Sequence, residues 1–284
     1  MKFSGSPAGF SVGDLDFLLW SNIFAYIIFK NIPRHMKTRY SLLAAVICFG
    51  LLFVPATASA QNNNPKNSER TTYIDDDLLP DAQVYLPAPN KPNNSLFVGD
   101  LAYYQWGKTV RDTERGKRAH EDANSDFSYL CSIFSPAAGV TLSYETTPKI
   151  CRLLSMTTAT ARAATSKAKK FYNRTRPFDE FKEPTGVPEK EASYTGSASY
   201  PSGHSTRGWS FALVLSELFP ERANEILSVG YQYGESRVIV GYHYESDVQA
   251  ARVSTSAVIS VLHSDKGFQK DMKKAKREAA KLSR

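Results

Sequence analysis

The feature that most constrains the fold is the spacing of apolar residues from Leu101 onward, which is helical almost throughout. Apolar side chains recur every three or four residues, as they do along one face of an α-helix. The strict alternation that is typical of half-buried strands is scarce. We therefore expect an all-α chain that folds as a single-domain helical bundle with crossover loops.

The expected ends of the helices follow from the positions of proline and glycine and from the spacing of the apolar residues. Thr147 and Pro148 are typical of an N-cap followed by proline at the first helical position. Residues 126–141 are mixed, and the basic run 273–284 is typical of a solvated helix face or a frayed tail. Residues 178–199 are expected to be a long loop, either a lid or rim over a substrate or a plain surface excursion. Helices are expected over residues 101–122, 148–173, 205–219 and 221–240, with a last long helix from about residue 243 to residue 262.

The first sixty residues have the organisation of an export signal. The basic stretch Met36 to Arg39 is followed by an apolar run from Ser41 to Val54, and then by the small residues Ala58, Ser59 and Ala60. This order is that of a secretory signal peptide, and the apolar run is too short to span a bilayer comfortably. We predict that residues 36–60 are the signal peptide. Residues 1–35 are then either a start codon assigned too early, which we favour, or a membrane-associated extension.

The remaining chain divides into an arm and one domain. Residues 61–94 are rich in Asn, Pro and Asp and are expected to form an extended N-terminal arm, which leaves residues 95–284 for the catalytic domain. Composition is ordinary for a globular protein, with 42% hydrophobic and 22% charged residues. Without residues 1–60 the chain has 30 basic and 26 acidic residues, a charge of about +4. This mild excess does not indicate a nucleic-acid partner.

The cysteines fit an exported protein. Cys48 lies in the apolar run of the signal, which leaves Cys131 and Cys151. An even pair in an exported chain predicts a disulfide, which would add roughly 3 kcal/mol in the chain-entropy model. Two buried free thiols are the alternative.

Three short motifs carry the residues that suit phosphate chemistry, in the order K-x6-RP, PSGH and SR-x5-H-x3-D. Taken singly, each has a plain structural explanation, such as solvated helix charges, a Ser-Gly turn or a surface His–Asp pair. So many fixed residues in one order are hard to obtain by chance. They are Lys169, Arg176 and Pro177, then Pro201, Ser202, Gly203 and His204, and then Ser236, Arg237, His243 and Asp247.

The first two motifs can bind a phosphoryl group. Lys169, Arg176 and Arg237 supply positive charge, and the planar fork of arginine suits bidentate contact with phosphate oxygens. The hydroxyl of Ser202 can donate a hydrogen bond. Gly203 allows close approach of the backbone to an anion at the start of a helix.

The histidines can carry the chemistry. His243 and Asp247 are four residues apart, so on a helix they share one face. A carboxylate bonded to one ring nitrogen fixes the tautomer and leaves the other nitrogen as a nucleophile. His204 is the natural acid for a leaving group, and afterwards the base that activates water.

The three motifs resemble, at every fixed position, the signature of the type 2 phosphatidic acid phosphatase superfamily. That superfamily includes the bacterial class A non-specific acid phosphatases and the vanadium haloperoxidases. The stretches Gly234–Ile239 and His120–Ala123 also look like the class A group, and the similarity covers most of residues 86–282. The resemblance implies an all-α fold of the acid phosphatase/vanadium haloperoxidase type.

The resemblance also implies roles for the motif residues. His243 would be the nucleophile that becomes a phosphohistidine, Asp247 would support it, and His204 would act as acid and base. The enzyme would need no metal or other cofactor, would be periplasmic or secreted and often oligomeric, and would hydrolyse a broad range of phosphate monoesters. Vanadate would inhibit it. Phosphate would be bound by Lys169, Arg176, Ser202, Gly203, His204 and Arg237.

One departure and three alternatives remain. The segment Thr195–Tyr200 is insertion-like, because the class A group more often has G-S-Y directly before PSGH. A vanadium haloperoxidase shares the motifs but is much longer. A membrane lipid phosphatase requires several spanning helices, and the sequence after residue 60 predicts no stable membrane insertion. A catalytically silent phosphate- or nucleotide-binding protein would not require His204, His243 and Asp247 together.

Overall fold

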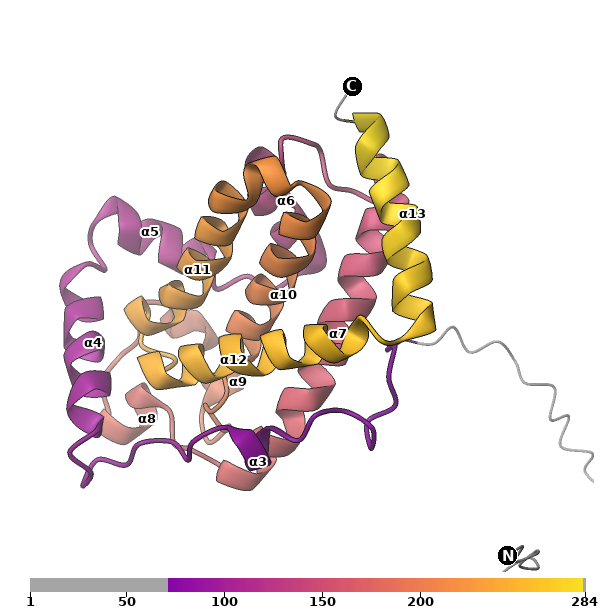
Figure 1. The fold of residues 1–284 in the computed structure, drawn as a ribbon. Helices are drawn as coiled ribbons and strands as arrows, with labels where there is room; N and C mark the ends of the chain where they lie inside the picture. The colour runs from indigo at the N-terminus through magenta and orange to yellow at the C-terminus, as the bar shows by residue number, and fades with distance from the viewer. Residues whose placement is uncertain (1–70, 283–284) are drawn as a thin grey trace, which may run out of the picture. The chain divides into compact units, whose positions relative to one another are not determined.

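The computed structural model describes residues 71–282, and these residues form helices and connecting segments without a β-strand, which confirms the predicted all-α class (Figure 1). The predicted signal peptide and residues 1–35 lie outside the described residues. The helices are α3 (Ala82–Tyr85), α4 (Phe97–Thr109), α5 (Glu114–Glu121), α6 (Phe127–Ala138), α7 (Pro148–Tyr172), α8 (Pro177–Phe181), η1 (Pro188–Lys190), α9 (Glu191–Tyr194), α10 (Gly203–Leu218), η2 (Pro220–Arg222), α11 (Ala223–Ile239), α12 (Glu245–Leu262) and α13 (Lys266–Leu282).

Helix α10 is at the centre of the packing. It contacts α7, α11 and α12, and α12 lies across α10 and α7 in Figure 1. The approach of α10 to α11 is close, because a Cβ atom added at Gly230 would lie 2.5 Å from that of Ala212. The main core gathers apolar side chains from α6, α7, α10, α11, α12 and α13 (among them Phe134, Leu153, Phe211, Leu215, Ile226, Val258 and Phe268).

Two helices differ from the sequence prediction near the N-terminal end of the bundle. The expected helix over 101–122 is two helices, α4 and α5, and Thr113 caps the second by accepting a hydrogen bond from the backbone N–H of Gly116. The mixed segment is helical as α6, with Pro136 close enough to its end to be tolerated. Gly139 then ends α6 in the left-handed conformation, with φ at 70°.

The basic C-terminal run is a packed helix rather than a frayed tail. Helix α13 contacts α7 and buries Phe268, Met272, Ala275 and Ala279, which recur every three or four residues. The lysines fall on the remaining positions, so the helix is amphipathic and its charge lies toward solvent.

Residues 71–96 are mostly irregular and are fixed to the bundle at several points. The backbone N–H of Tyr73 donates to the hydroxyl of Thr160 in α7, at 3.0 Å. The hydroxyl of Tyr200 donates to the carbonyl of Pro87, at 2.6 Å. The expected loop over 178–199 contains the short helices η1 and α9. No helix within residues 71–282 is both long enough and apolar enough to span a bilayer.

The predicted disulfide between Cys131 and Cys151 is not present. Both cysteines are buried in the core as free thiols, one on α6 and one on α7. The two thiols hydrogen-bond to each other, which raises the pKa of Cys131 together with burial. The two thiols therefore meet in the core as reduced side chains, without a covalent link.

Candidate active site

The eight site residues predicted from the motifs converge from the ends of four long helices and the segments that follow them. Each motif lies where a helix begins or ends, so its side chains and free backbone groups can meet in one place. Lys169 is in the last turn of α7, Arg176 precedes α8, Ser202, Gly203 and His204 begin α10, Arg237 is in the last turn of α11, and His243 and Asp247 lie at the start of α12.

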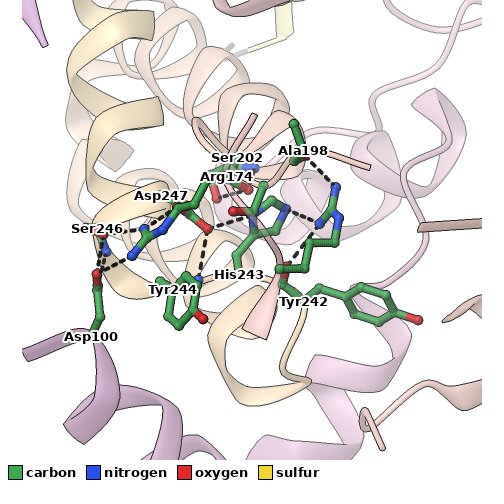
Figure 2. A network of polar contacts seen from close by, with 12 residues as sticks. Asp100, Arg174, Ala198, Ser202, Tyr242, His243, Tyr244, Ser246 and Asp247 are labelled. Carbon is green, nitrogen blue, oxygen red and sulfur yellow. Dashed lines mark hydrogen bonds and ion pairs between the residues drawn. The ribbon is translucent and has the colours of Figure 1, made fainter. Parts of the chain in front are cut away.

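His243 is held from both of its ring nitrogens. Its Nδ1 lies 3.2 Å from Oδ2 of Asp247 (Figure 2). Its Nε2 lies 3.1 Å from Nη1 of Arg176. A carboxylate only accepts and a guanidinium only donates, so Nδ1 carries the hydrogen and Nε2 presents its lone pair. Burial, and then the charges of Arg176 and Lys169, lower the pKa of His243 well below its ordinary value. The ring is thus a neutral imidazole whose nucleophilic Nε2 accepts a hydrogen bond from Arg176.

His243 is not on the helix, contrary to the sequence prediction. Helix α12 begins at Glu245, and His243 lies in the connection from α11, where its backbone N–H donates to the carbonyl of Arg237 at 3.2 Å. Asp247 is in the first turn, and its Oδ2 also accepts from the backbone N–H of Tyr244 at 3.0 Å. The His–Asp contact is therefore made across a helix N-terminus, where a negative charge is favoured.

Two of the cations are held by backbone carbonyls of the segment before the PSGH motif. Nζ of Lys169 donates to the carbonyls of Ala198 and Ser199, at 2.9 and 3.1 Å. Arg176 donates from Nη2 to the carbonyl of Ala198 at 3.1 Å and from Nε to that of Ser197 at 3.1 Å. The insertion-like segment 195–200 thus lies directly against the phosphate-binding side chains.

Positive charge accumulates in this site. Burial and the neighbouring Arg176 lower the pKa of Lys169 to about 7. Burial and the neighbouring Arg237 lower the pKa of Arg176 to about 10. Burial and the neighbouring cation disfavour the charged form of each side chain, so an anion bound here would be stabilised.

The guanidinium of Arg237 is almost completely buried, and its charge is poorly compensated. Its side chain is 1% accessible, and its guanidinium carbon lies 4.7 Å from the ring centre of Tyr242. Within residues 71–282, neither Nε nor Nη1 has a hydrogen-bond partner. Burial lowers its pKa. Buried donors of this kind nearly always have a partner in native proteins, so the guanidinium lacks an acceptor that a ligand would supply.

The PSGH motif forms the N-terminus of α10. Oγ of Ser202 caps the helix by accepting from the backbone N–H of Ser205 at 3.3 Å. The position of a Cβ at Gly203 would be open, with only Nη1 of Arg207 nearby at 3.9 Å. The cap occupies the N–H of Ser205, whereas the first two N–H groups of this 16-residue helix have no partner within the helix and can face an anion.

His204 is buried beside the cations. Its Nε2 lies 3.3 Å from the carbonyl of Ala123, so Nε2 carries a hydrogen and Nδ1 is the nitrogen that titrates. Burial, and then the charges of Arg237 and Arg207, lower the pKa of His204 well below its ordinary value.

The stretch His120–Ala123 also borders the site. Ala123 contacts His204, and Oδ2 of Asp122 accepts a hydrogen bond from the hydroxyl of Ser236 at 2.6 Å. Asp122 therefore fixes the residue that precedes Arg237. No group of three His, Cys, Asp or Glu side chains within residues 71–282 is placed to hold a metal ion.

Three residues of the site were missed by the sequence reasoning: Asp100, Arg174 and Ser246. Arg174 lies behind Asp247 and links it to Asp100, and Ser246 joins the same network (Figure 2). Arg174 falls among the unspecified positions of K-x6-RP, and Asp100 precedes Ser246 by 146 residues. No spacing in the sequence connects them.

Comparison with known proteins identifies the family. Residues 150–269 match the PAP2 superfamily. Over 245 residues the chain is 38% identical to a non-specific acid phosphatase of Providencia stuartii, which covers 85% of this chain and 99% of that protein. The chain belongs to the PAP2 superfamily. Within it, the chain is also 36% identical to a non-specific acid phosphatase of Salmonella typhimurium over 86% of this chain and 93% of that protein. An acid phosphatase of Zymomonas mobilis is 31% identical over 82% of this chain and 87% of that protein.

Proposed function

We propose that this PAP2 protein is an exported acid phosphatase that hydrolyses phosphate monoesters through a phosphohistidine on His243. The observation that carries the proposal is the buried guanidinium of Arg237, whose Nε and Nη1 have no partner among the described residues. An uncompensated buried charge is costly, and a phosphate dianion would supply the missing acceptors. Lys169 and Arg176 belong to the same electropositive site, since each is destabilised by a neighbouring cation.

The first half of the reaction transfers the phosphoryl group to the enzyme. Nε2 of His243 attacks phosphorus, the bond from phosphorus to the leaving oxygen breaks, and His204 donates a proton to that oxygen. Lys169, Arg176 and Arg237 stabilise the charge on the equatorial oxygens. Asp247 stabilises the positive imidazole ring through Nδ1, at 3.2 Å in the free enzyme.

The second half releases phosphate. His204, now neutral, takes a proton from a water molecule, whose oxygen attacks phosphorus. The phosphorus–nitrogen bond breaks, inorganic phosphate leaves, and His243 returns to its neutral form. The three protein cations perform the charge neutralisation that a divalent metal performs in other phosphatases, so we infer that no metal is required.

Substrate range and location follow from different observations. Relatives from two genera are named non-specific acid phosphatases, which supports a broad range of phosphate monoesters. The basic, apolar and small-residue order of residues 36–60 supports export to the periplasm. Vanadate, a phosphoryl transition-state mimic, is expected to inhibit the enzyme, and a homo-oligomer remains a prediction from the family resemblance.

The test is hydrolysis of p-nitrophenyl phosphate in EDTA across a range of pH. The parent is compared with His243→Ala and with the control His263→Ala, whose imidazole contacts Glu217 on the surface, at 3.0 Å. We expect activity in the parent and in the control and none in His243→Ala. Rapid quenching of the parent should trap a phosphoenzyme that is labile in acid and stable in alkali.

Two results would contradict the proposal. Full activity in His243→Ala would remove His243 as the nucleophile. A folded parent without phosphatase activity would favour a silent phosphate-binding protein or a haloperoxidase, which halide oxidation in the presence of vanadate and hydrogen peroxide would distinguish.

A further inference from the structure

Arg174 is a buried arginine at an unspecified position of the K-x6-RP motif. It is 8% accessible, and its two terminal nitrogens face two different carboxylates. Nη1 donates to Oδ1 of Asp247 at 2.6 Å, and Nη2 donates to Oδ2 of Asp100 at 2.7 Å. The guanidinium also lies 4.0 Å from the ring centre of Tyr244. It therefore bridges Asp247 to a carboxylate on a distant helix, as Figure 2 shows.

The far end of the bridge is fixed as firmly as the near end. Asp100, on α4, is 3% accessible. Its Oδ1 accepts from the backbone N–H of Ser246 at 2.9 Å, and its Oδ2 accepts from the hydroxyl of Ser246 at 2.6 Å. Because Ser246 is next to Asp247, Asp100 holds both Arg174 and the first turn of α12. The four groups form one row: Asp100, Arg174, Asp247 and His243.

The two oxygens of Asp247 have separate partners. Oδ2 contacts Nδ1 of His243 and the backbone N–H of Tyr244, whereas Oδ1 contacts Arg174. A carboxylate held at both oxygens cannot rotate, so Oδ2 stays directed at the imidazole. Burial disfavours the charge of Arg174, but Asp247 and Asp100 outweigh that effect and its pKa is raised. Arg174 is a permanent cation that compensates two buried carboxylates.

Arg174 balances the buried carboxylates, whereas Lys169 and Arg176 serve the phosphoryl group of the substrate. Arg174 forms a direct ion pair with the buried Asp247, whose field also reaches the phosphate-binding cations Lys169 and Arg176. With Arg174 in place, those cations keep their capacity for the phosphoryl group.

We propose that Arg174 is a positioning residue that sets the orientation of the nucleophilic His243 through Asp247, with Asp100 as its anchor. The proposal rests on the phosphohistidine mechanism proposed above. Arg174 does not touch the phosphoryl group. Its loss is therefore expected to lower kcat while phosphate binding by Lys169, Arg176 and Arg237 persists.

The experiment compares the parent with Arg174→Gln, Arg174→Lys and Asp100→Asn, all as the full chain. We expect kcat of Arg174→Gln to fall by about 100-fold, since misplacement of a reacting group by about 1 Å has an effect of that order. KM for p-nitrophenyl phosphate and the Kd of inorganic phosphate, measured by calorimetry, should stay within about 3-fold of the parent values. The reason is that the substitution leaves the phosphate-binding side chains Lys169, Arg176 and Arg237 in place. Arg174→Lys keeps the charge but not the planar fork, so its kcat should be intermediate.

A chemical rescue tests the role of the guanidinium itself. A cavity of about 220 Å³ borders Arg174 and is also lined by Asn90 and Tyr244. In Arg174→Ala, added guanidinium ion should enter and restore part of kcat, whereas ammonium at the same ionic strength should not. Arg152→Ala, which removes an arginine that pairs with Asp271 far from the motifs, should show neither the loss nor the rescue.

The outcomes separate this proposal from the proposed function. If the parent is active through His243 and Arg174→Gln keeps the kcat of the parent, the positioning role is wrong and the phosphatase assignment stands. If an Arg174 variant loses phosphate binding together with kcat, whether it is folded or not, then Arg174 has only a structural role and the proposal is wrong. An inactive parent overturns the function on which both rest.

Discussion

Replacement of Arg237 by methionine is expected to make the ligand-free protein more stable and the enzyme nearly inactive. The residue is 1% accessible, and its Nε and Nη1 have no acceptor in the part of the chain that the structure describes. An uncompensated charge of this kind disfavours folding by several kcal/mol, and loss of the contact with Tyr242 at 4.7 Å offsets about 1–2 kcal/mol of the gain. Methionine fills a similar volume, so we expect a net stabilisation of about 2 kcal/mol.

Calorimetric unfolding in phosphate-free buffer measures this gain. For a domain of this size, about 2 kcal/mol corresponds to a rise in Tm of about 4–8 °C. The parent should also gain stability from added phosphate, by about 2.7 kcal/mol at 100 times its Kd, and Arg237→Met should gain much less. Its kcat should fall by about 10²–10³, the usual effect of removing one donor to the transition state.

A matched control, Arg115→Met, is expected to lower the stability of the protein instead of raising it. Arg115 donates to Glu235 at 3.0 Å and to the hydroxyl of Ser236 at 3.0 Å, so its charge is compensated. Arg115→Met should therefore lower the stability by about 1 kcal/mol. If Arg237→Met proves less stable than the parent without phosphate, or keeps the full phosphate-dependent gain, the view of Arg237 as an unpaired phosphate ligand is refuted.

Four further predictions follow from the pKa shifts and the thiols. Because the pKa of His204 is lowered below about 6.5, kcat/KM should decrease as pH rises through that acidic range, and a profile flat from acid to alkaline pH would exclude His204 as the acid. The pKa of His243 is lowered as well, so the unfolded state takes up protons first, and unfolding in phosphate-free buffer should become easier as pH falls below about 6.5. Lys169, with a pKa of about 7, loses its charge above neutral pH, so KM should rise between pH 6 and pH 8 and Lys169→Arg should flatten that rise in steady-state kinetics. Cys131 and Cys151 should both be alkylated by iodoacetamide in denaturant without reductant, as mass spectrometry would show, and protection of the pair would indicate a disulfide.

The parts of the site that the sequence predicted are those whose chemistry is tied to short spacing. K-x6-RP, PSGH and SR-x5-H-x3-D each lie at one helix end, so a local pattern is enough to identify phosphate-binding and nucleophilic groups. Arg174 and Asp100 could not be found in this way. They meet only because α4 packs beside α12, and burial of an arginine between two carboxylates is a property of tertiary structure.

The errors in the fold have similarly local causes. His243 was placed on a helix because its spacing to Asp247 is four, but Tyr244 is extended, with φ at −78° and ψ at 159°, and acts as the N-cap. The helix within residues 126–141 was not predicted because the segment contains Pro136, which α6 accommodates near its end. Of the two alternatives for the run 273–284, the solvated helix face is confirmed and the frayed tail is wrong, because Ala275 and Ala279 pack against the bundle.

The carboxylate of Asp247 serves two purposes, because it caps the first turn of α12 through the N–H of Tyr244 and also orients His243. Selection for folding alone would therefore retain this aspartate even in a descendant that had stopped turning over substrate. His243 has no comparable part in the helix, so it could be lost without such resistance. In comparisons among homologues, the histidine is the residue whose presence reports activity, and the aspartate is the one whose presence reports the fold.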